Sequence, residues 1–348
     1  MMRKYHSAIA LLVVILGFPA CHYDVTSFDT PTWTADIIGP LALSSMRLED
    51  IKELNDLEYV TDISVNGLNY DTSGVYVPAL PIPLLSFDIH FFDIFHYVDA
   101  DSIALTITLQ NNLGVDIAEG GEIRFTNKVG GELIYSFTLT QPIPKDSTLQ
   151  VNIVVINKTI EPDIVMTLAG FSTKEESSAT LSSDDYIRVS LRLDFIRINE
   201  ASVKDSVTAT ISDTTGFNLQ GEGLSVVSIE GLFNTYINNS LPFWGEIEAY
   251  FLTQGDGALL DSLFVDSLFH EAVVRVPDLL PNGKVAEPYE TKLDSVWMDN
   301  ERINRIIDAK TVYFRLKLTS PHRQPLIADN RFPLEAQIVG DLKVEIEN

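Results

Sequence analysis

Residues 187–195 (IRVSLRLDF) alternate apolar and polar side chains at every position. The apolar side chains are Ile187, Val189, Leu191, Leu193 and Phe195, and arginine, serine or aspartate occupies the positions between them. In a β-strand, a period of two places all the apolar side chains on one face and all the polar side chains on the other. The stretch therefore predicts a strand of an antiparallel sheet with one buried face and one solvated face.

Three more stretches repeat this period of two, at residues 103–109, 149–155 and 312–318. Turn-forming pairs such as Asn111-Asn112 lie between the alternating stretches. Short alternating strands joined by such turns are typical of β-sandwiches. Because 348 residues suffice for two domains of ordinary size, we predict an all-β protein of two antiparallel β-sandwich units.

Two helices are expected beside the strands. Leu48, Ile51, Leu54 and Leu57 recur at helix-like spacing and predict a short N-terminal helix over residues 46–57. In the second unit, an apolar stripe predicts a helix that Asp299 or Asn300 caps and that runs to Ala309. Residues 260–269 (LDSLFVDSLF) fit a helix or two short strands, and their flanks favour strands.

The predicted organisation has five parts along the chain. Residues 1–20 form an export signal and residues 21–45 a polar tether rich in turn-forming residues. Residues 46–98 hold the N-terminal helix and an extended connector, in which prolines argue against a central strand. Residues 99–205 form the first sandwich unit and residues 206–348 the second.

Two segments of the second unit echo segments of the first. Residues 233–249 echo residues 103–118, and residues 329–346 echo residues 184–198. A divergent duplication and a chance likeness of two strand-rich segments both remain open. The order of strand, asparagine, turn and strand resembles late-embryogenesis-abundant type 2 modules over a short part of each repeat, and this resemblance implies β-sandwiches without catalytic machinery.

The N-terminus has the pattern of an export signal. Arg3 and Lys4 precede an apolar run at residues 8–18, and Pro19 and Ala20 lead to Cys21. A permanent membrane-spanning helix needs about twenty apolar residues, so this run of eleven is too short. We therefore expect it to be removed after export.

The segment that ends at Cys21 resembles the lipobox of bacterial lipoproteins. Ala20 matches that motif, whereas Phe18 and Pro19 depart from its commonest residues. The resemblance implies that residues 1–20 are removed and that Cys21 carries the lipid that anchors the protein in the membrane. His22 stands where some bacterial lipoproteins carry a retention aspartate, so the resemblance favours the outer membrane, on its periplasmic face or at the cell surface. Cleavage by an ordinary signal peptidase is the competing interpretation, and the bulky Phe18 disfavours it.

Composition excludes several classes of partner. The chain has 24 basic and 49 acidic side chains and a net charge of −25, which becomes −27 once Arg3 and Lys4 are removed (−25 − 2). Such an acidic chain lacks the clustered lysine and arginine that nucleic acids require. The single cysteine excludes an internal disulfide framework and a multi-cysteine zinc site.

We find no motif for catalysis or for a cofactor. The chain has no Gly-x-Ser-x-Gly motif, and lipidation would remove its one cysteine as a nucleophile. His90 and His96, with Asp88 and Asp93 beside them, would suit a metal, but the phenylalanines and isoleucines between them favour core or edge packing. We therefore predict a protein that is not an enzyme and binds no cofactor.

One short triplet recurs: aspartate, then serine or threonine, then an aliphatic residue or threonine. It resembles the O-glycosylation acceptor of exported proteins of the Bacteroidota. That resemblance would place sugars on Ser102, Ser147, Ser206, Thr214, Ser262, Ser267 and Ser295. The alternative is structural, because Asp-Ser turns often precede strands.

These observations predict an exported, lipid-anchored, non-enzymatic binding or scaffolding protein at the outer membrane, of the kind found in Bacteroidota. Its expected partners are the membrane, through Cys21, and envelope proteins or glycans. The alternative is a carbohydrate-binding component of a glycan-uptake system. Exposed tryptophans would favour that alternative, although core packing is the default for Trp33, Trp244 and Trp297.

Overall fold

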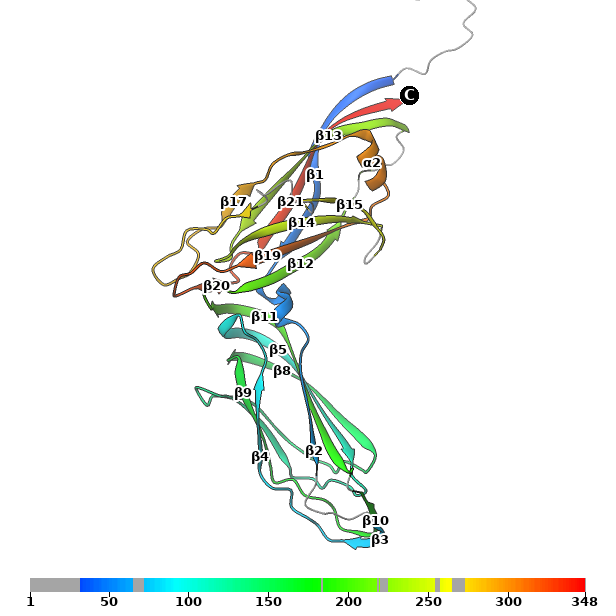
Figure 1. The fold of residues 1–348 in the computed structure, drawn as a ribbon, viewed down its shortest axis with the longest axis vertical. Coiled ribbons are helices and arrows are strands. Elements are labelled where there is room, and N and C mark those ends of the chain that lie inside the picture. Colours follow the sequence, from blue (N-terminus) through cyan, green and yellow to red (C-terminus); the bar gives the residue numbers. More distant parts are fainter. Residues whose placement is uncertain are drawn as a thin grey trace, which may run out of the picture.

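A computed structural model describes residues 32–64, 72–182, 184–217, 219, 225–253, 257–264 and 273–347. Figure 1 shows two β-sandwich units that lie end to end along the long axis of the molecule. Their sheets are antiparallel, so the predicted all-β class and two-sandwich architecture are confirmed. We call the unit that holds strands β2 to β11 unit 1, and the unit that holds β1 and strands β12 to β21 unit 2.

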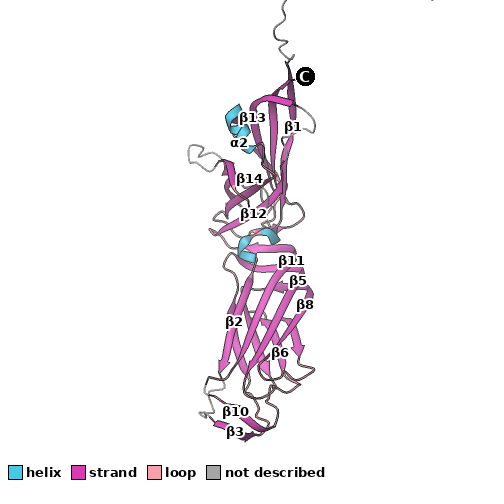
Figure 2. Cartoon of the chain, turned by 90° about the vertical axis from the view of Figure 1, so that its right-hand side faces the viewer, coloured by secondary structure: helices cyan, strands magenta, loops and turns pink. Residues whose placement is uncertain are grey.

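Unit 1 packs a five-stranded sheet against a four-stranded sheet, and the fifth strand of the former is β20 (Ile327–Asp329), which pairs with β11. The first has the order β2–β11–β5–β8, with strands β2 (Leu57–Ser64), β11 (Tyr186–Val203), β5 (Phe95–Asn112) and β8 (Ser147–Ile160). The second has the order β4–β9–β6–β7, with strands β4 (Leu85–His90), β9 (Asp163–Ala169), β6 (Glu122–Asn127) and β7 (Leu133–Thr138). A small sheet of β3 (Thr72–Val77) and β10 (Glu176–Leu181) lies at the end of unit 1 that is farthest from unit 2 (Figure 2).

Unit 2 has the same arrangement. Its first sheet has the order β1–β21–β13–β17, and its strands are β1 (Thr32–Met46), β21 (Leu334–Glu347), β13 (Ser225–Asn239) and β17 (Tyr289–Lys292), with β18 (Val296–Met298) also paired to β13. Its second sheet has the order β12–β19–β14–β15, and its strands are β12 (Thr208–Gly216), β19 (Thr311–Thr319), β14 (Trp244–Leu252) and β15 (Leu259–Leu263), with β16 (Val273–Val274) paired to β14.

The two units are nested along the chain. Each strand of the two main sheets of unit 1, apart from β20, has a counterpart at the same sheet position in unit 2. In chain order the pairs are β2 with β1, β4 with β12, β5 with β13, β6 with β14, β7 with β15, β8 with β17 and β18, β9 with β19, and β11 with β21. Unit 1 is therefore inserted between the first and second strands of unit 2. The echoes found in the sequence fall on corresponding strands, β5 with β13 and β11 with β21, which is the outcome that a duplication predicts.

A buried asparagine ends the long central strand of unit 1. Asn111 Nδ2 donates to the carbonyl oxygens of Val115 (3.0 Å), Ile143 (3.0 Å) and Pro144 (3.1 Å). Its Oδ1 accepts a hydrogen bond from the N–H of Leu113 at 3.0 Å. The side chain thus closes the turn after β5 by satisfying backbone groups that have no partner in the sheet.

Unit 2 has the same device at Asn239. Its Nδ2 donates to the carbonyl oxygens of Phe243 (2.7 Å) and Arg275 (2.8 Å), and its Oδ1 accepts from the N–H of Leu241 (3.0 Å). Both asparagines therefore bond the N–H two residues ahead and the carbonyl four residues ahead. Corresponding positions of β5 and β13 differ by 128 residues (239 − 111).

The inward faces of the alternating strands form the core of each sandwich. In unit 1 the buried set includes Ile103, Leu105, Ile107 and Leu109 of β5, and in unit 2 aromatic side chains of three strands are fully buried, namely Phe233, Phe251 and Phe314. Alternation along the strand is thus a reliable guide to burial here, because each sheet has one face against its partner sheet and one face in solvent.

The predicted tether is wrong for residues 32–45, because these residues form most of β1. This strand pairs antiparallel with β21 along its whole length. The sheet tolerates Pro40 because β1 is an edge strand whose register shifts between Pro40 and Ala42. The boundary at residues 205 and 206 falls between β11 and β12, but residues 46–98 belong to unit 1, since they include β2, β3, β4 and the start of β5.

The predicted N-terminal helix is also wrong. Two short 3-10 helices, η1 (Leu48–Asp50) and η2 (Lys52–Leu54), replace it. The apolar residues are spaced by three, which is the period of a 3-10 helix, and the extended ψ of 121° at Ile51 separates the two turns. Leu48, Ile51 and Leu54 are completely buried where the two units meet.

The second predicted helix is confirmed, though it is shorter than expected. It is α2 (Asn300–Ile306), and the side chain of Asp299 caps it by accepting a hydrogen bond from Arg302 N at 2.8 Å. The preference for a strand at residues 260–269 is confirmed for β15, whereas residues 265–269 lie outside the described residues. In the part of the chain that is described, no helix has the length and apolar character to cross a membrane.

A strand pairing, an ion pair and a β-bridge join the two units in addition to the chain connections. Strand β20 (Ile327–Asp329), which comes from the second half of the chain, pairs with the end of β11. Lys284 forms an ion pair with Glu200 of β11, and Ile51 makes a β-bridge with Ile211 of β12. These contacts fix unit 1 against the end of unit 2.

Candidate binding site

The sequence-predicted modification sites do not form one site. Cys21 and Ser267 lie outside the described residues. Ser206, Thr214 and Ser295 are exposed and come from different parts of unit 2 and its border, whereas Ser102, Ser147 and Ser262 are half-buried.

Several aspartates of the recurrent triplet have structural roles. Asp213 and Asp261 each accept a hydrogen bond from the N–H of the following residue, both at 2.8 Å. Asp261 also pairs with Arg302 at 3.0 Å, and this hydrogen bond holds the pKa of Asp261 below its usual value although burial raises it. Asp213 lies within β12 and Asp261 within β15, so these two hydrogen bonds do not belong to turns, whereas Asp146 and Asp205 lie in turns just before β8 and β12. The turn interpretation of the triplet is therefore supported at Asp146 and Asp205, while the hydroxyl of Thr214 remains exposed.

A groove of about 320 Å³ lies on the outer face of the first sheet of unit 2. Leu43, Gln337 and Tyr236 follow one another across β1, β21 and β13. One step further along, Glu335 of β21, Asn238 of β13 and Glu290 of β17 form a second row. These six side chains line the groove, because the residues that alternate with them, such as Ile237 and Ala336, face the core.

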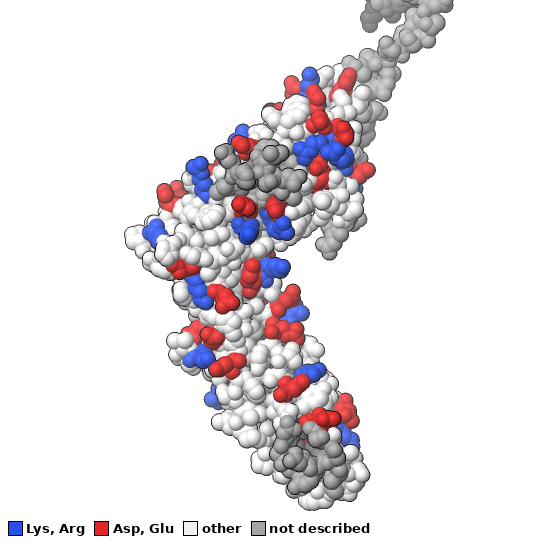
Figure 3. Space-filling view, viewed as in Figure 1, with Lys and Arg blue, Asp and Glu red and all other residues white. Residues whose placement is uncertain are grey.

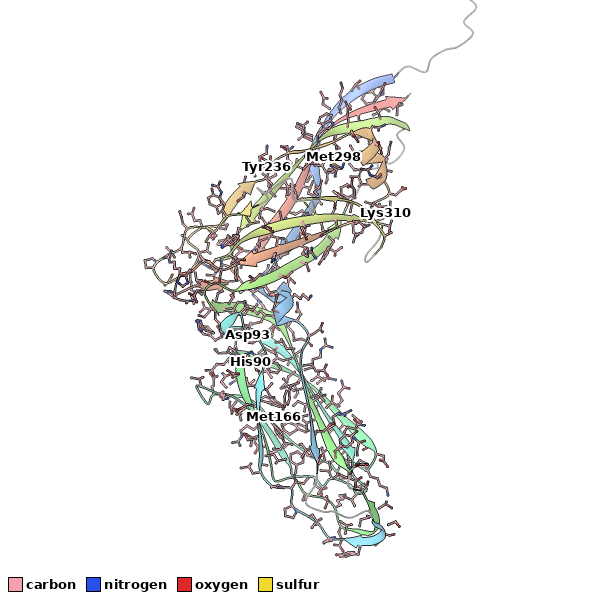
Figure 4. All side chains as sticks on the ribbon, viewed as in Figure 1. His90, Asp93, Met166, Tyr236, Met298 and Lys310 are labelled. Atoms are coloured by element: carbon pink, nitrogen blue, oxygen red, sulfur yellow. The ribbon has the colours of Figure 1, made fainter. Side chains whose placement is uncertain are left out.

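The groove combines an aromatic ring with amides and carboxylates. Asn238 Nδ2 donates to Glu335 Oε2 at 3.4 Å, and Lys292 Nζ lies 5.7 Å from the centre of the Tyr236 ring. Among the described residues, neither Glu290 nor Glu335 forms an ion pair. Both carboxylates are therefore available to a ligand that donates hydrogen bonds or carries positive charge. Figure 4 places Tyr236 on the side of unit 2 near β17.

Unit 1 lacks this groove at the corresponding positions. The offset of 128 and the strand register match Tyr236 with Thr108, Glu335 with Arg188, and Glu290 with Thr148. Arg188 is already paired with Asp62, at 2.7 and 2.9 Å. At these positions the charged side chain of unit 1 is held in an ion pair, whereas the two carboxylates of unit 2 form no ion pair with a described residue and lie beside a ring.

A second, wider groove lies where the units meet. It measures about 500 Å³ and is lined by Glu53, Phe91, Phe92, Asp93, Ile94, Val207 and Thr208. Glu53 Oε2 accepts a hydrogen bond from Thr210 N at 3.0 Å, and Phe92 is packed into the core. Its polar groups are few and its most buried carboxylate is already bonded, so its role at the junction is better explained by packing than by ligand binding.

His90 lies beside this junction with both ring nitrogens bonded (Figure 4). Its Nδ1 is 2.9 Å from Asp163 Oδ1 and its Nε2 is 3.0 Å from Asp93 Oδ1. The bond to Asp163 raises the pKa of His90 above its usual value, and Asp93 adds to this effect. No group of three metal-ligating side chains occurs in the described part of the chain, and the structure places His96 on β5, away from the end of β4.

The three tryptophans lie apart from one another, and all are partly exposed. Trp33 of β1 is 46% exposed, Trp244 of β14 is 42% exposed and Trp297 of β18 is 54% exposed. Only Trp297 shares the outer face with the groove, because it pairs with Leu232 on β13. Figure 3 shows acidic and basic side chains mixed over the visible face of both units, so an extended field of one sign does not dominate that face.

Sequence analysis named Trp297 but missed the groove residues. Tyr236 and Asn238 occupy the polar positions of an alternating strand, which looks like an ordinary solvated face. The two echoes did not mark the difference either, because aligning their Asn-Asn pairs puts Tyr236 opposite Leu109, and its match to Thr108 depends on the strand register of the structure. Glu290, on a four-residue strand, gave no signal either.

No family model matches the chain, and no curated protein matches it. Among solved structures, a protein expected to be secreted, from Parabacteroides distasonis ATCC 8503, is similar at 13% identity and a TM-score of 0.30, over 91% of this chain and 100% of that one. The N-terminal CBM22-1-CBM22-2 tandem domain of Xyn10C from Paenibacillus barcinonensis is similar at 9% identity and a TM-score of 0.20, over 90% and 100%. A fucolectin from the serum of the striped bass Morone saxatilis is similar at 7% identity and a TM-score of 0.20, over 88% and 99%. At such TM-scores the similarity does not extend to a binding site.

Proposed function

We propose that the protein is exported, held at the outer membrane by a lipid on Cys21, and acts there as a non-enzymatic binding or scaffolding protein. The observation that carries the binding role is the groove on the outer face of unit 2, where a tyrosine, two amides and two unpaired carboxylates converge. The proposal that it is not an enzyme rests on the sequence, which has no nucleophile motif. Ser206 Oγ does lie 3.3 Å from His322 Nδ1, but that same nitrogen is 2.8 Å from Asp205 Oδ2, so the aspartate does not hold the other ring nitrogen as a catalytic triad requires.

The fold fits an anchor at Cys21. Ten residues separate Cys21 from Thr32, where β1 begins, and an extended chain of that length spans at most about 35 Å. Figure 1 shows the start of β1 and the C-terminus at the end of unit 2 that faces away from unit 1. An anchored protein would therefore hold unit 2 next to the membrane and project unit 1 away from it.

The anchor is tested by growing cells with labelled palmitate. Wild-type protein should incorporate the label and fractionate with the outer membrane, and the Cys21→Ser variant should do neither. A labelled Cys21→Ser variant would overturn the anchor. Protease shaving of intact cells then separates the two faces of the outer membrane, because a surface protein is cleaved and a periplasmic one is protected.

Carbohydrate binding is the second candidate function, and the composition of the groove favours it. A ring with amides and carboxylates around it suits a sugar, whose C–H faces pack on aromatic rings and whose hydroxyls bond polar groups. Titration with soluble polysaccharides, followed by tryptophan fluorescence, should show binding that Tyr236→Ala weakens. Thr108→Ala, at the corresponding position of unit 1, is the matched control and should leave binding unchanged. If cross-linking instead recovers an envelope protein and no polysaccharide binds, the scaffolding role is favoured.

The recurrent triplets are proposed as O-glycosylation sites, first at the exposed hydroxyls of Ser206 and Thr214, because the hydroxyl of Ser295 already donates to Asn234 Oδ1. Intact-mass spectrometry of the native protein should show a mass above that of the polypeptide plus lipid. A mass equal to that sum would remove the glycan interpretation and leave the turn role that Asp146 and Asp205 display.

A further inference from the structure

A second aromatic side chain lies on the same face as the groove. Trp297 is 54% exposed and sits opposite Leu232 of β13. Leu232 and Tyr236 are four residues apart on that strand and point to the same face. At about 3.3 Å per residue, the two aromatic positions are therefore about 13 Å apart along the sheet.

An amide and an aliphatic side chain lie between the two rings, Asn234 on β13 and Val339 opposite it on β21. Asn234, midway along β13, accepts a hydrogen bond at Oδ1 from Ser295 Oγ at 2.7 Å, which leaves its Nδ2 free to donate. On the neighbouring strand β21, Asp341 lies opposite Leu232 and Gln337 lies opposite Tyr236. The face thus presents Trp297 on β18, then Asn234, Tyr236 and Asn238 along β13, with the two carboxylates of the groove on the strands beside Asn238.

The corresponding face of unit 1 has neither ring. Leu232 corresponds to Ala104, whose partner on β8 is Val154, and Tyr236 corresponds to Thr108. The charged side chains of that face are engaged with one another, as in the pair of Arg192 and Asp194 at 2.9 Å. Two units with one topology therefore differ at both aromatic positions, which is the difference expected if only one of them binds an elongated ligand.

We propose that an extended glycan chain lies along the outer face of unit 2, with one sugar ring on Trp297 and another on Tyr236. This inference rests on the carbohydrate-binding function proposed above and adds a second subsite to it. The glycan hydroxyls that lie between Trp297 and Tyr236 bond to Asn234 and Gln337. The glycan hydroxyls beyond Tyr236 bond to Asn238, Glu290 and Glu335. Because the two subsites act on one ligand, a chain long enough to reach both binds more tightly than a chain that reaches one.

The test compares disaccharides with hexasaccharides of the cello, manno and xylo series, by isothermal titration of the mature lipoprotein in detergent. The hexasaccharide that binds should do so at least about tenfold more tightly than its disaccharide. Trp297→Ala should weaken hexasaccharide binding and so remove this gain, whereas Tyr236→Ala should weaken binding of both ligands. Trp244→Ala is the matched control, since Trp244 is similarly exposed but lies on β14 of the other sheet.

The outcomes separate the inference from the function on which it rests. Binding without a gain from length, or a gain that survives Trp297→Ala, overturns the extended site and leaves a carbohydrate groove at Tyr236. Failure of every oligosaccharide to bind overturns the carbohydrate function and the extended site together, and leaves the lipid anchor and the scaffolding role standing.

Discussion

Asn111 and Asn239 each hold a turn together from inside the protein. Each is completely buried and bonds two backbone groups of its turn, at Leu113 and Val115 in unit 1 and at Leu241 and Phe243 in unit 2. An alanine at either position leaves two or more buried backbone groups without a partner, which costs about 1–3 kcal/mol for each group after relaxation. We expect Asn111→Ala and Asn239→Ala each to lower the free energy of unfolding by about 3 kcal/mol.

The two asparagine variants are distinguishable because all three tryptophans are in unit 2. Asn239→Ala should shift denaturation followed by tryptophan fluorescence, and Asn111→Ala should shift denaturation followed by circular dichroism. Asn112→Ala is the control, since Asn112 accepts one hydrogen bond from Gln110 and supports no turn. A loss below about 1 kcal/mol in both test variants would contradict the structural role.

The hydrogen bonds of His90 predict how the stability of the protein depends on pH. Its bonds to Asp163 and Asp93 raise its pKa above the usual value of 6.5, so the protonated form is favoured by folding. The resulting stability is fully present below about pH 6.5 and is lost as pH rises through the folded pKa. Because the side chain is 49% exposed, the effect should stay below about 1 kcal/mol.

Urea denaturation at a series of pH values measures this effect. The wild type should lose stability as pH rises above about 6.5, and His90→Gln should show a smaller loss. His96→Gln serves as the control, since that side chain is exposed on β5 and takes no part in the pair. Equal pH profiles for the wild type and His90→Gln would rule out the proposed coupling.

At the scale of elements, β1 completes unit 2 although the whole of unit 1 follows it in the chain. Deleting residues 32–46 exposes the edge of β21 and removes the buried side chains of Ala42 and Met46. The tryptophan-reported unfolding transition of unit 2 should then be lost or move to a much lower temperature. The transition of unit 1, followed by circular dichroism, should persist.

A deletion of residues 22–31 is the control for loss of the N-terminal segment, because it keeps β1. It should leave both transitions in place. If the deletion of residues 32–46 behaves in the same way as this control, β1 is dispensable and the nested arrangement is not needed for the stability of unit 2.

The period of two in the sequence predicted β5, β8, β11 and β19 because one face of each meets the other sheet. It did not predict β1, where Gly39, Pro40 and a register shift interrupt the alternation at a sheet edge. It also could not separate an α-helix from two 3-10 turns, since leucines and isoleucine spaced by three suit both. The groove depends on which strands are neighbours, and strand order is a long-range property that a local pattern does not contain.

At the scale of the whole molecule, two copies of one topology have acquired different outer faces. Unit 1 presents the ion pairs of Arg188 and Arg192, and unit 2 presents Tyr236, Trp297 and free carboxylates. With a lipid on Cys21, unit 2 would lie next to the membrane and unit 1 would project from it. A ligand bound by unit 2 would then be held close to the membrane surface.

The central claim is that unit 2, and not unit 1, carries the binding face, and side-chain footprinting tests it without knowledge of the partner. Hydroxyl radicals label exposed side chains of the protein in isolated outer membranes and of the purified protein. We predict that Tyr236, Trp297 and Leu43 are protected in the membranes, whereas Val154 and Val60, at the positions in unit 1 that correspond to Trp297 and Leu43, are labelled equally in both samples. Protection of Val154 and Val60 with no protection of Tyr236 and Trp297 would contradict the claim.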